Sequence, residues 1–149
     1  IFVETYDADG NLVDAGLTLD GTSGDDVLIG DFGNDILSAL GGTDTLTGNE
    51  GSDTFLFEVL STDLTTITDF QPGEDEIDLS GIDAIFATPE DDAFEFIGTD
   101  PFDGTAGQLR IEVAPEGVTL MGDTNGDQIT DFAIFLPDQT DISVDYLIM

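Results

Sequence analysis

Large apolar residues recur at every ninth position between residues 21 and 56. The segment divides into four consecutive nonapeptides: GTSGDDVLI (21–29), GDFGNDILS (30–38), ALGGTDTLT (39–47) and GNEGSDTFL (48–56). Position eight is always large and apolar (Leu28, Leu37, Leu46, Phe55), position four is always glycine (Gly24, Gly33, Gly42, Gly51), and position six is always aspartate (Asp26, Asp35, Asp44, Asp53). Composition alone does not produce eight such coincidences, so this region is a structural repeat.

Each position of the nonapeptide has a physical role. Glycine admits a positive φ and a tight turn with inward-pointing carbonyls, and the apolar residue at position eight lies on a short strand that faces a core. Two nonapeptides then form one coil with two turns and two strands, so four nonapeptides predict two coils. In the competing interpretation, glycine and aspartate only mark the turns of an ordinary β-solenoid.

Stacked coils place each repeat beneath the next repeat but one. Asp26 then lies over Asp44, and Asp35 lies over Asp53. Carboxylates at that spacing repel each other unless a cation lies between them. Ca²⁺ takes six to eight oxygen ligands in a flexible geometry, whereas Mg²⁺ demands a rigid octahedron and keeps its waters, so the spacing favours calcium.

The charge balance of the whole chain agrees with bound cations. Among 149 residues, 34 are acidic, one is basic and none is histidine or cysteine, which gives a formal net charge of −33. This balance excludes nucleic-acid and anionic-membrane partners, and it removes thiolate chemistry and the usual ligands of zinc. Any metal must therefore be bound by oxygen. A halophilic acidic surface is the alternative explanation of the charge.

The four nonapeptides resemble the G-G-x-G-x-D-x-U-x repeat of repeats-in-toxin (RTX) proteins, in which U is a large apolar residue. The resemblance implies an all-β fold with a right-handed parallel β-roll, and calcium ions bound between turns by backbone oxygens and position-six aspartates. One implied site comprises Thr22, Gly24, Asp26, Ala39, Gly41 and Asp44; the second comprises Asp31, Gly33, Asp35, Gly48, Glu50 and Asp53. Ala39 and Leu40 depart from the paired glycines of the family pattern.

Segments flanking the repeats are expected to cover the open ends of the roll. We therefore divide the chain into an N-terminal flank or cap (1–20), the roll (21–56) and a C-terminal capping and secretion region (57–149). In the first flank, Leu17 and Leu19 are apolar. Acidic and amide side chains there offer either a cation site or a hairpin turn, at Asp7, Asp9, Asn11 and Asp14.

Residues 66–84 read as a strand, a Pro-Gly turn, a second strand and a short helical or turn segment. They are similar to the segment after the roll in serralysin-type metalloproteases, where acidic residues complete the final calcium sites. Asp63 and Asp69 are the nearest matches in this chain. Thr65 stands where that family commonly has an aspartate.

From residue 93 onwards, short alternating runs separated by turn residues predict an antiparallel sheet or sandwich. Within it, GDTNGDQITDF spaces oxygen ligands as in calcium loops of the D-x-D-x-D-G-x-x-D type. The candidate ligands are Asp123, Asn125, Asp127, Ile129 through its carbonyl, and Asp131. Gln128 replaces the usual glycine, and a polar hairpin turn is the alternative.

The chain ends in Asp145-Tyr146-Leu147-Ile148-Met149, one acid followed by four apolar residues. This ending predicts a last strand, and it resembles the uncleaved C-terminal signal of type I (ABC-transporter) secretion substrates. No N-terminal export signal is visible, and the start without methionine suggests a piece of a longer protein. We expect an extracellular location and an N-terminal parent domain.

Three classes of function follow. The first is a noncatalytic, calcium-binding C-terminal module of an exported protein, which folds when Ca²⁺ becomes available outside the cell. The second is an enzyme, but zinc-protease chemistry needs an H-E-x-x-H motif, and no pair of carboxylates stands out as catalytic. The third is a calcium-dependent module that recognises polysaccharide or mediates adhesion.

Overall fold

The computed structural model describes residues 5–6, 8–9, 12–13 and 16–149. Asp7, Asn11 and Asp14 of the N-terminal cation hypothesis lie outside these residues. The strands are β1 Thr5–Tyr6, β2 Leu12–Val13, β3 Thr18–Asp20, β4 Val27–Ile29, β5 Ile36–Ser38, β6 Thr45–Thr47, β7 Thr54–Leu56, β8 Leu64–Ile67, β9 Glu76–Asp78, β10 Glu95–Phe96, β11 Gln108–Ala114, β12 Gly117–Asp123, β13 Phe132–Pro137 and β14 Leu147–Ile148.

Helix is almost absent from the described residues. It is confined to η1, a single 3₁₀ turn over Val144–Tyr146 that Ser143 caps through its side chain. Nothing in the described part of the chain forms a helix that is long and apolar enough to span a membrane. The predicted all-β class is confirmed.

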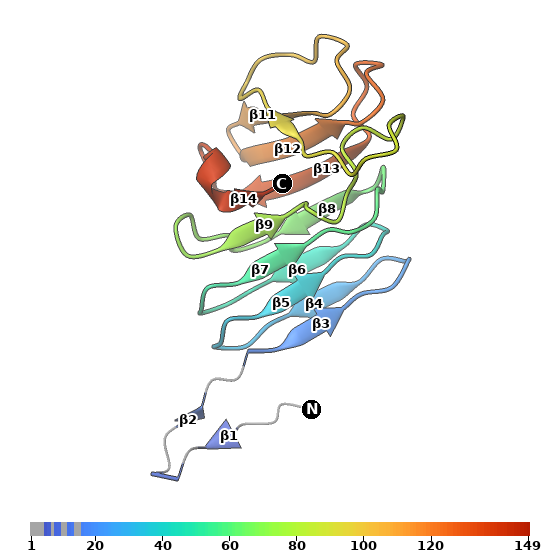
Figure 1. Cartoon of the computed structure of the whole chain (residues 1–149). Coiled ribbons are helices and arrows are strands. Elements are labelled where there is room, and N and C mark those ends of the chain that lie inside the picture. Colours follow the sequence, from blue (N-terminus) through green and yellow to red (C-terminus); the bar gives the residue numbers. More distant parts are fainter. Residues whose placement is uncertain (1–4, 7, 10–11, 14–15) are drawn as a thin grey trace.

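Successive strands of the repeat region alternate between two sheets. The first sheet has the order β14-β9-β7-β5-β3, and the second has the order β10-β11-β12-β13-β8-β6-β4. Every pairing among β3 to β9 is parallel. The chain changes sheet after each nine-residue repeat, so strands two repeats apart become neighbours, as predicted. Figure 1 shows these strands stacked as the rungs of a roll.

Position-eight residues form the core between the two sheets. In one sheet Leu37 pairs with Phe55, and in the other Leu28 pairs with Leu46. Leu37, Leu46 and Phe55 are completely buried. Burying a side chain of this size contributes about 2 kcal/mol, so the apolar residue of each nonapeptide supplies the main force that closes the coil.

The roll extends beyond the predicted limits of residues 21 and 56. β3, which lies in the predicted N-terminal cap, is itself a rung and pairs in parallel with β5. Beyond residue 56, β8 pairs with β6, and β9 pairs with β7. Residue 67 rather than residue 64 pairs with Leu46, because extra residues after the fourth repeat lie in loops and leave the stacking intact.

The C-terminal antiparallel sheet is continuous with the roll. β11 to β13 pair antiparallel, as predicted, but β13 then pairs in parallel with β8. The last strand, β14, adds in parallel to β9 in the other sheet. The capping region therefore extends both sheets of the roll, which covers strand edges that would otherwise be open.

Candidate metal centre

The bends of the roll place the position-six residues in two stacks. We call Asp26, Asp44 and Thr65 the first column, and Asp35, Asp53 and Asp75 the second column. The alignment follows from strand register, since Thr45 pairs with Thr66 beside Asp44, and Thr54 pairs with Glu76 beside Asp53. The stacking of Asp26 over Asp44 and of Asp35 over Asp53 agrees with the sequence expectation.

One oxygen of Asp44, of Asp53 and of Asp75 accepts a hydrogen bond from the neighbouring coil. The amide of Asp26 donates to Asp44 Oδ1 at 3.0 Å, and the amide of Asp35 donates to Asp53 Oδ1 at 2.8 Å. The amide of Asp53 donates to Asp75 Oδ1 at 3.0 Å. These bonds hold the carboxylates one above another at the spacing of neighbouring strands.

The second carboxylate oxygen, Oδ2, has a hydrogen-bond partner in some repeats and none in others. In the first two repeats it accepts the amide of position two, which is Thr22 for Asp26 (2.6 Å) and Asp31 for Asp35 (2.7 Å). In the last two repeats, Oδ2 of Asp44 and Oδ2 of Asp53 are buried without a hydrogen-bond partner.

These two aspartates are 2% and 1% exposed, respectively. A buried carboxylate oxygen without a partner costs several kcal/mol unless it is protonated or bound to a cation. A cation beside these two oxygens would supply the partner that neither has.

Burial also perturbs the acidity of these groups. Desolvation raises the pKa of Asp53 to about 6, and the carboxylates of Asp75, Asp35 and Asp69 add to that increase. Desolvation likewise raises the pKa of Asp44 and of Asp75. Without an ion, Asp44, Asp53 and Asp75 are therefore harder to ionise than aspartates in water.

Backbone carbonyls converge on the same space as the carboxylates. A Cβ atom at Gly30 would lie 2.2 Å from Asp35 Oδ2 and 2.6 Å from the Gly48 carbonyl oxygen of the next coil. A Cβ atom at Gly51, whose φ is +139°, would lie 2.2 Å from the Gly33 carbonyl oxygen. Glycine is required at these turns because neighbouring coils approach too closely for a side chain.

The donor set consists entirely of hard oxygens. Within the described residues, no group of three or more carboxylates converges on one point, so an ion there must also use carbonyl oxygens. Two stacked carboxylates with several turn carbonyls suit Ca²⁺, which accepts mixed carboxylate and carbonyl ligands. The residues of the columns fit calcium on this test.

The remaining turn residues of the two implied sites lie in the same bends. Each of them lies in a turn that connects two consecutive strands from β3 to β7. These residues are Thr22, Gly24, Asp31, Gly33, Ala39, Gly41, Gly48 and Glu50. Ala39 is buried, which shows that this turn tolerates one extra methyl group, whereas the Glu50 side chain is exposed. Their roles as calcium ligands stay predictions.

The sequence analysis missed Asp75. It is buried, and its Oδ2 accepts the amide of Gln71 at 2.8 Å, as position six does in the first two repeats. Gly73, Asp75 and Ile77 have the spacing of positions four, six and eight, so Phe70–Asp78 is a further repeat unit. A fixed nine-residue spacing continued from residue 56 does not reach this unit, because residues 57–69 place its start out of register with the four nonapeptides.

The two predicted acids after the roll occupy different places. Asp69 binds the last nonapeptide, accepting the amide of Gly48 at Oδ1 (2.9 Å) and that of Asn49 at Oδ2 (2.8 Å). This places Asp69 beside the second column. Asp63 is exposed and accepts a hydrogen bond from Ser61 Oγ at 3.2 Å, two residues before Thr65.

The loop between β12 and β13 is closed by its own hydrogen bonds. Asp123 accepts the amides of Asn125 and Gly126 at Oδ1 and that of Gln128 at Oδ2. Gln128 makes the bend without glycine, at a φ of +68°.

The other predicted ligands of this loop are similarly engaged. Asp131 Oδ2 accepts the amide and hydroxyl of Thr124, and Asp127 Oδ1 accepts the amide of Ile129. The arrangement favours the hairpin-turn alternative, and the calcium role of this loop stays a prediction.

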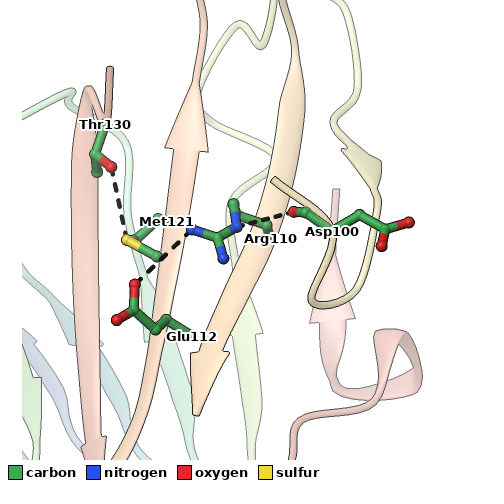
Figure 2. A network of polar contacts seen from close by, with 5 residues as sticks. All are labelled: Asp100, Arg110, Glu112, Met121 and Thr130. Atoms are coloured by element: carbon green, nitrogen blue, oxygen red, sulfur yellow. Dashed lines mark hydrogen bonds and ion pairs between the residues drawn. The ribbon is translucent and has the colours of Figure 1, made fainter. Parts of the chain in front are cut away.

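The single basic residue has its contacts elsewhere. Figure 2 shows Arg110 on β11, where its Nε donates to the Asp100 carbonyl at 2.9 Å and its Nη1 lies 3.9 Å from Glu112 Oε2. Its guanidinium also lies 5.7 Å from the centre of the Phe102 ring. Arg110 therefore fastens the loop before β11 to the sheet, and the columns have no internal cation beside them.

A family model and one solved structure agree with this architecture. The model of the family described as peptidase M10 serralysin C terminal matches residues 9–148. The solution structure of the AlgE6R3 subunit from the Azotobacter vinelandii mannuronan C5-epimerase matches with a TM-score of 0.53 and 27% identity, over 91% of this chain and 78% of that chain. The AlgE6R2 subunit of the same epimerase matches with a TM-score of 0.39 and 23% identity, over 87% and 90%.

A search of curated protein sequences gives no match. The family model, in contrast, spans nearly all of the 149 residues, and it confirms the RTX and serralysin resemblance of the repeats. The chain belongs to the peptidase M10 serralysin C-terminal family.

Proposed function

We propose that this chain is a noncatalytic calcium-binding module of a larger exported protein, and that Ca²⁺ completes its folding outside the cell. The observation that carries the proposal is the pair of buried carboxylate oxygens, Oδ2 of Asp44 and Oδ2 of Asp53, that have no hydrogen-bond partner. A divalent cation supplies the missing partner and offsets the repulsion between stacked aspartates.

Calcium concentration would make folding depend on location. Extracellular calcium modules have dissociation constants of about 10⁻⁴ to 10⁻³ M, far above the free calcium of the cytosol. With a net charge of −33, the metal-free chain repels itself and stays expanded during export. Binding after export then supplies free energy directly to folding.

The C-terminus supports the export part of the proposal. The last residues resemble a type I secretion signal, and in the folded chain Leu147–Ile148 form β14 against β9. Tyr146 packs against Phe70, with ring centres 6.3 Å apart. Substrates of this pathway pass through the ABC transporter unfolded, so these residues are free to act as a signal before calcium orders the roll.

Calcium-dependent folding is tested by circular dichroism. In a chelator we expect a largely unordered spectrum, and millimolar Ca²⁺ restores β-structure. Asp53→Asn should raise the calcium midpoint by roughly tenfold, because the site loses a charged ligand. Asp91→Asn is the matched control, since Asp91 is exposed in a loop. A spectrum that is identical with and without calcium contradicts the proposal.

Carbohydrate recognition is a second candidate, supported by one surface feature. Phe86 is 79% exposed and lines a shallow hollow of about 320 Å³ with Leu60, Thr62, Thr124, Asn125 and Asp131. An exposed aromatic ring beside hydroxyl and amide groups suits the apolar face and hydroxyls of a sugar. Glycan-array binding in calcium, lost in Phe86→Ala, would support this function, and an array without any bound glycan would remove it.

A further inference from the structure

The loop between β12 and β13 contains a chemically labile pair of residues, Asn125 and Gly126. The sequence has no other asparagine that precedes a glycine. Asparagine deamidates when the backbone nitrogen of the next residue attacks the side-chain carbon Cγ. Glycine has no side chain to hinder that approach and leaves the backbone free to turn. The pair is therefore a candidate site of covalent modification.

The fold requires the glycine of this pair. Gly126 has a φ of +76°, and a Cβ atom there would lie 2.7 Å from the carbonyl oxygen of Gly104. Gly104 belongs to the segment between β10 and β11, so two loops meet here backbone against backbone. A larger residue after Asn125 would disrupt this contact. The chain therefore keeps a labile pair for a structural reason.

Hydrogen bonds hold both reacting groups of the pair. The backbone nitrogen of Gly126, which would attack, donates to Asp123 Oδ1 at 2.7 Å. The side-chain nitrogen of Asn125, which would leave, donates to both carboxylate oxygens of Asp131, at 3.1 and 3.2 Å. The side-chain oxygen of Asn125 accepts the amide of Asp127 at 2.8 Å. Turning the Asn125 side chain towards the Gly126 nitrogen breaks these contacts.

The two carboxylates that hold the pair are themselves fixed. Asp123 is 0% exposed, and its Oδ2 accepts the amide of Gln128 at 2.9 Å. Oδ2 of Asp131 accepts the amide and the hydroxyl of Thr124, at 2.8 and 2.6 Å. Neither acid is free to follow Asn125 as it turns, so the reaction requires the loop to open.

We infer that Asn125–Gly126 is a deamidation site that the folded loop suppresses and that unfolding exposes. In the reaction, the Gly126 nitrogen bonds to Cγ of Asn125, and the bond from Cγ to Nδ2 breaks. The proton of the attacking amide leaves with Nδ2 as ammonia. Water then opens the cyclic imide to aspartate or to isoaspartate, and no other reactant is needed. The inference does not depend on calcium binding.

The product does not fit the loop. With aspartate in place of Asn125, a carboxylate oxygen replaces the nitrogen that donates to Asp131, and two like charges face each other. Isoaspartate also lengthens the backbone of the turn. Because Asn125 and Asp131 line the hollow beside Phe86, deamidation changes the shape and the charge of that surface.

Peptide mapping by mass spectrometry tests the inference. Wild-type protein is incubated in mildly alkaline, calcium-containing buffer with or without urea, and the deamidated fraction at Asn125 is followed over time. Deamidation should be at least roughly tenfold slower in the folded protein, because loss of a hydrogen bond to a charged group shifts an equilibrium by about that factor. Asn34 is the internal reference. It is also exposed but precedes Asp35, so it should react slowly in both states.

Two variants of the same loop identify the hydrogen bonds that protect Asn125. Asp131→Ala removes the acceptor of the Asn125 side chain and should speed deamidation of the folded protein by roughly tenfold. Asp127→Ala is the matched control, because it removes one acid whose carboxylate accepts the amide of Ile129 instead of the Asn125 side chain. It should leave the rate unchanged. Circular dichroism establishes that each variant is folded during the incubation.

Three results would overturn the inference. The first is an equal rate in folded and urea-unfolded wild type, because the loop would then give no protection. The second is a folded Asp131→Ala variant that deamidates as slowly as Asp127→Ala. The third is an Asn125 that is as stable in urea as Asn34, which would mean that the pair is not labile. If Asp131→Ala does not fold, the comparison of folded and unfolded wild type decides.

Discussion

Asp53 in the roll and Asp123 in the C-terminal sheet are equally buried but differently satisfied. Asp53 is 1% exposed, and its Oδ2 has no partner. Asp123 is 0% exposed, yet three backbone amides of its own loop donate to its two oxygens. Burial of an acid therefore does not by itself indicate a metal; an unsatisfied oxygen does.

The difference has a geometric origin. A short loop between antiparallel strands can fold its own amides around a carboxylate, as residues 124–128 do. At Asp44 and Asp53 in the roll, the amide that donates to the carboxylate belongs to a neighbouring coil, and that coil brings its own carboxylate with it. The same stacking that supplies one hydrogen bond to Asp44 and to Asp53 also brings a second carboxylate close enough to repel each of them.

The largest expected effect comes from the close approach of neighbouring coils in the roll. Gly51→Ala should lower the free energy of unfolding in calcium by about 3 kcal/mol, because its φ of +139° disfavours a side chain and the added Cβ would overlap the Gly33 carbonyl. Urea denaturation measures this loss.

Gly73→Ala is the control for Gly51→Ala. Gly73 also has a positive φ, +89°, but no atom lies within 4 Å of its added Cβ. The cost should be about 1 kcal/mol, from backbone strain alone. Equal losses in the two variants would mean that the coils do not approach as closely as the structure shows.

A smaller effect separates the two buried aspartates. Asp123→Asn should cost about 1–3 kcal/mol at every calcium concentration at which the chain is folded, because the amide nitrogen cannot accept the hydrogen bond from Gln128. The cost of Asp53→Asn should instead grow with calcium concentration. Thermal unfolding of both variants at several calcium concentrations that keep the wild type folded makes the test, and a calcium-dependent cost of Asp123→Asn would indicate that the loop binds metal.

The smallest effect concerns pH. Because the pKa of Asp53 is raised from 3.8 to about 6, the folded metal-free chain binds a proton that the unfolded chain releases between those values. The free energy of unfolding should therefore fall as pH rises from about 4 to 6. Circular dichroism of dialysed, metal-free protein at several pH values checks the sign, since the β-structure signal should increase as pH falls from about 6 to 4.

Calcium should reverse that dependence. The ion requires the ionised carboxylate, so calcium affinity should fall as pH is lowered through about 6. Titrations at pH 5 and pH 7.5 measure the change, with Asp53→Asn as the control that loses part of it. A calcium affinity that is independent of pH would mean that Asp53 is not a ligand of the metal site.

Much of the fold and of the site was predictable from the repeat. The spacing of Gly51, Asp53 and Phe55 predicts a turn, a stacked acid and a core residue, and all three lie as predicted. The pairing of β13 with β8 was not predictable, because it joins strands that are separated by most of the C-terminal region. Neither was the hydrogen-bond state of Asp123, which depends on where loop amides point.

The sequence by itself determined the rungs between residues 21 and 56, because a strict nine-residue period makes every contact a repetition of one local geometry. Only the tertiary structure decided how the columns end. Once residues 57–69 break the period, long-range strand pairing alone determines that Asp75 stacks on Asp53 and that Thr65 stacks on Asp44. Pairing energy between distant strands, rather than chain periodicity, fixed those two positions.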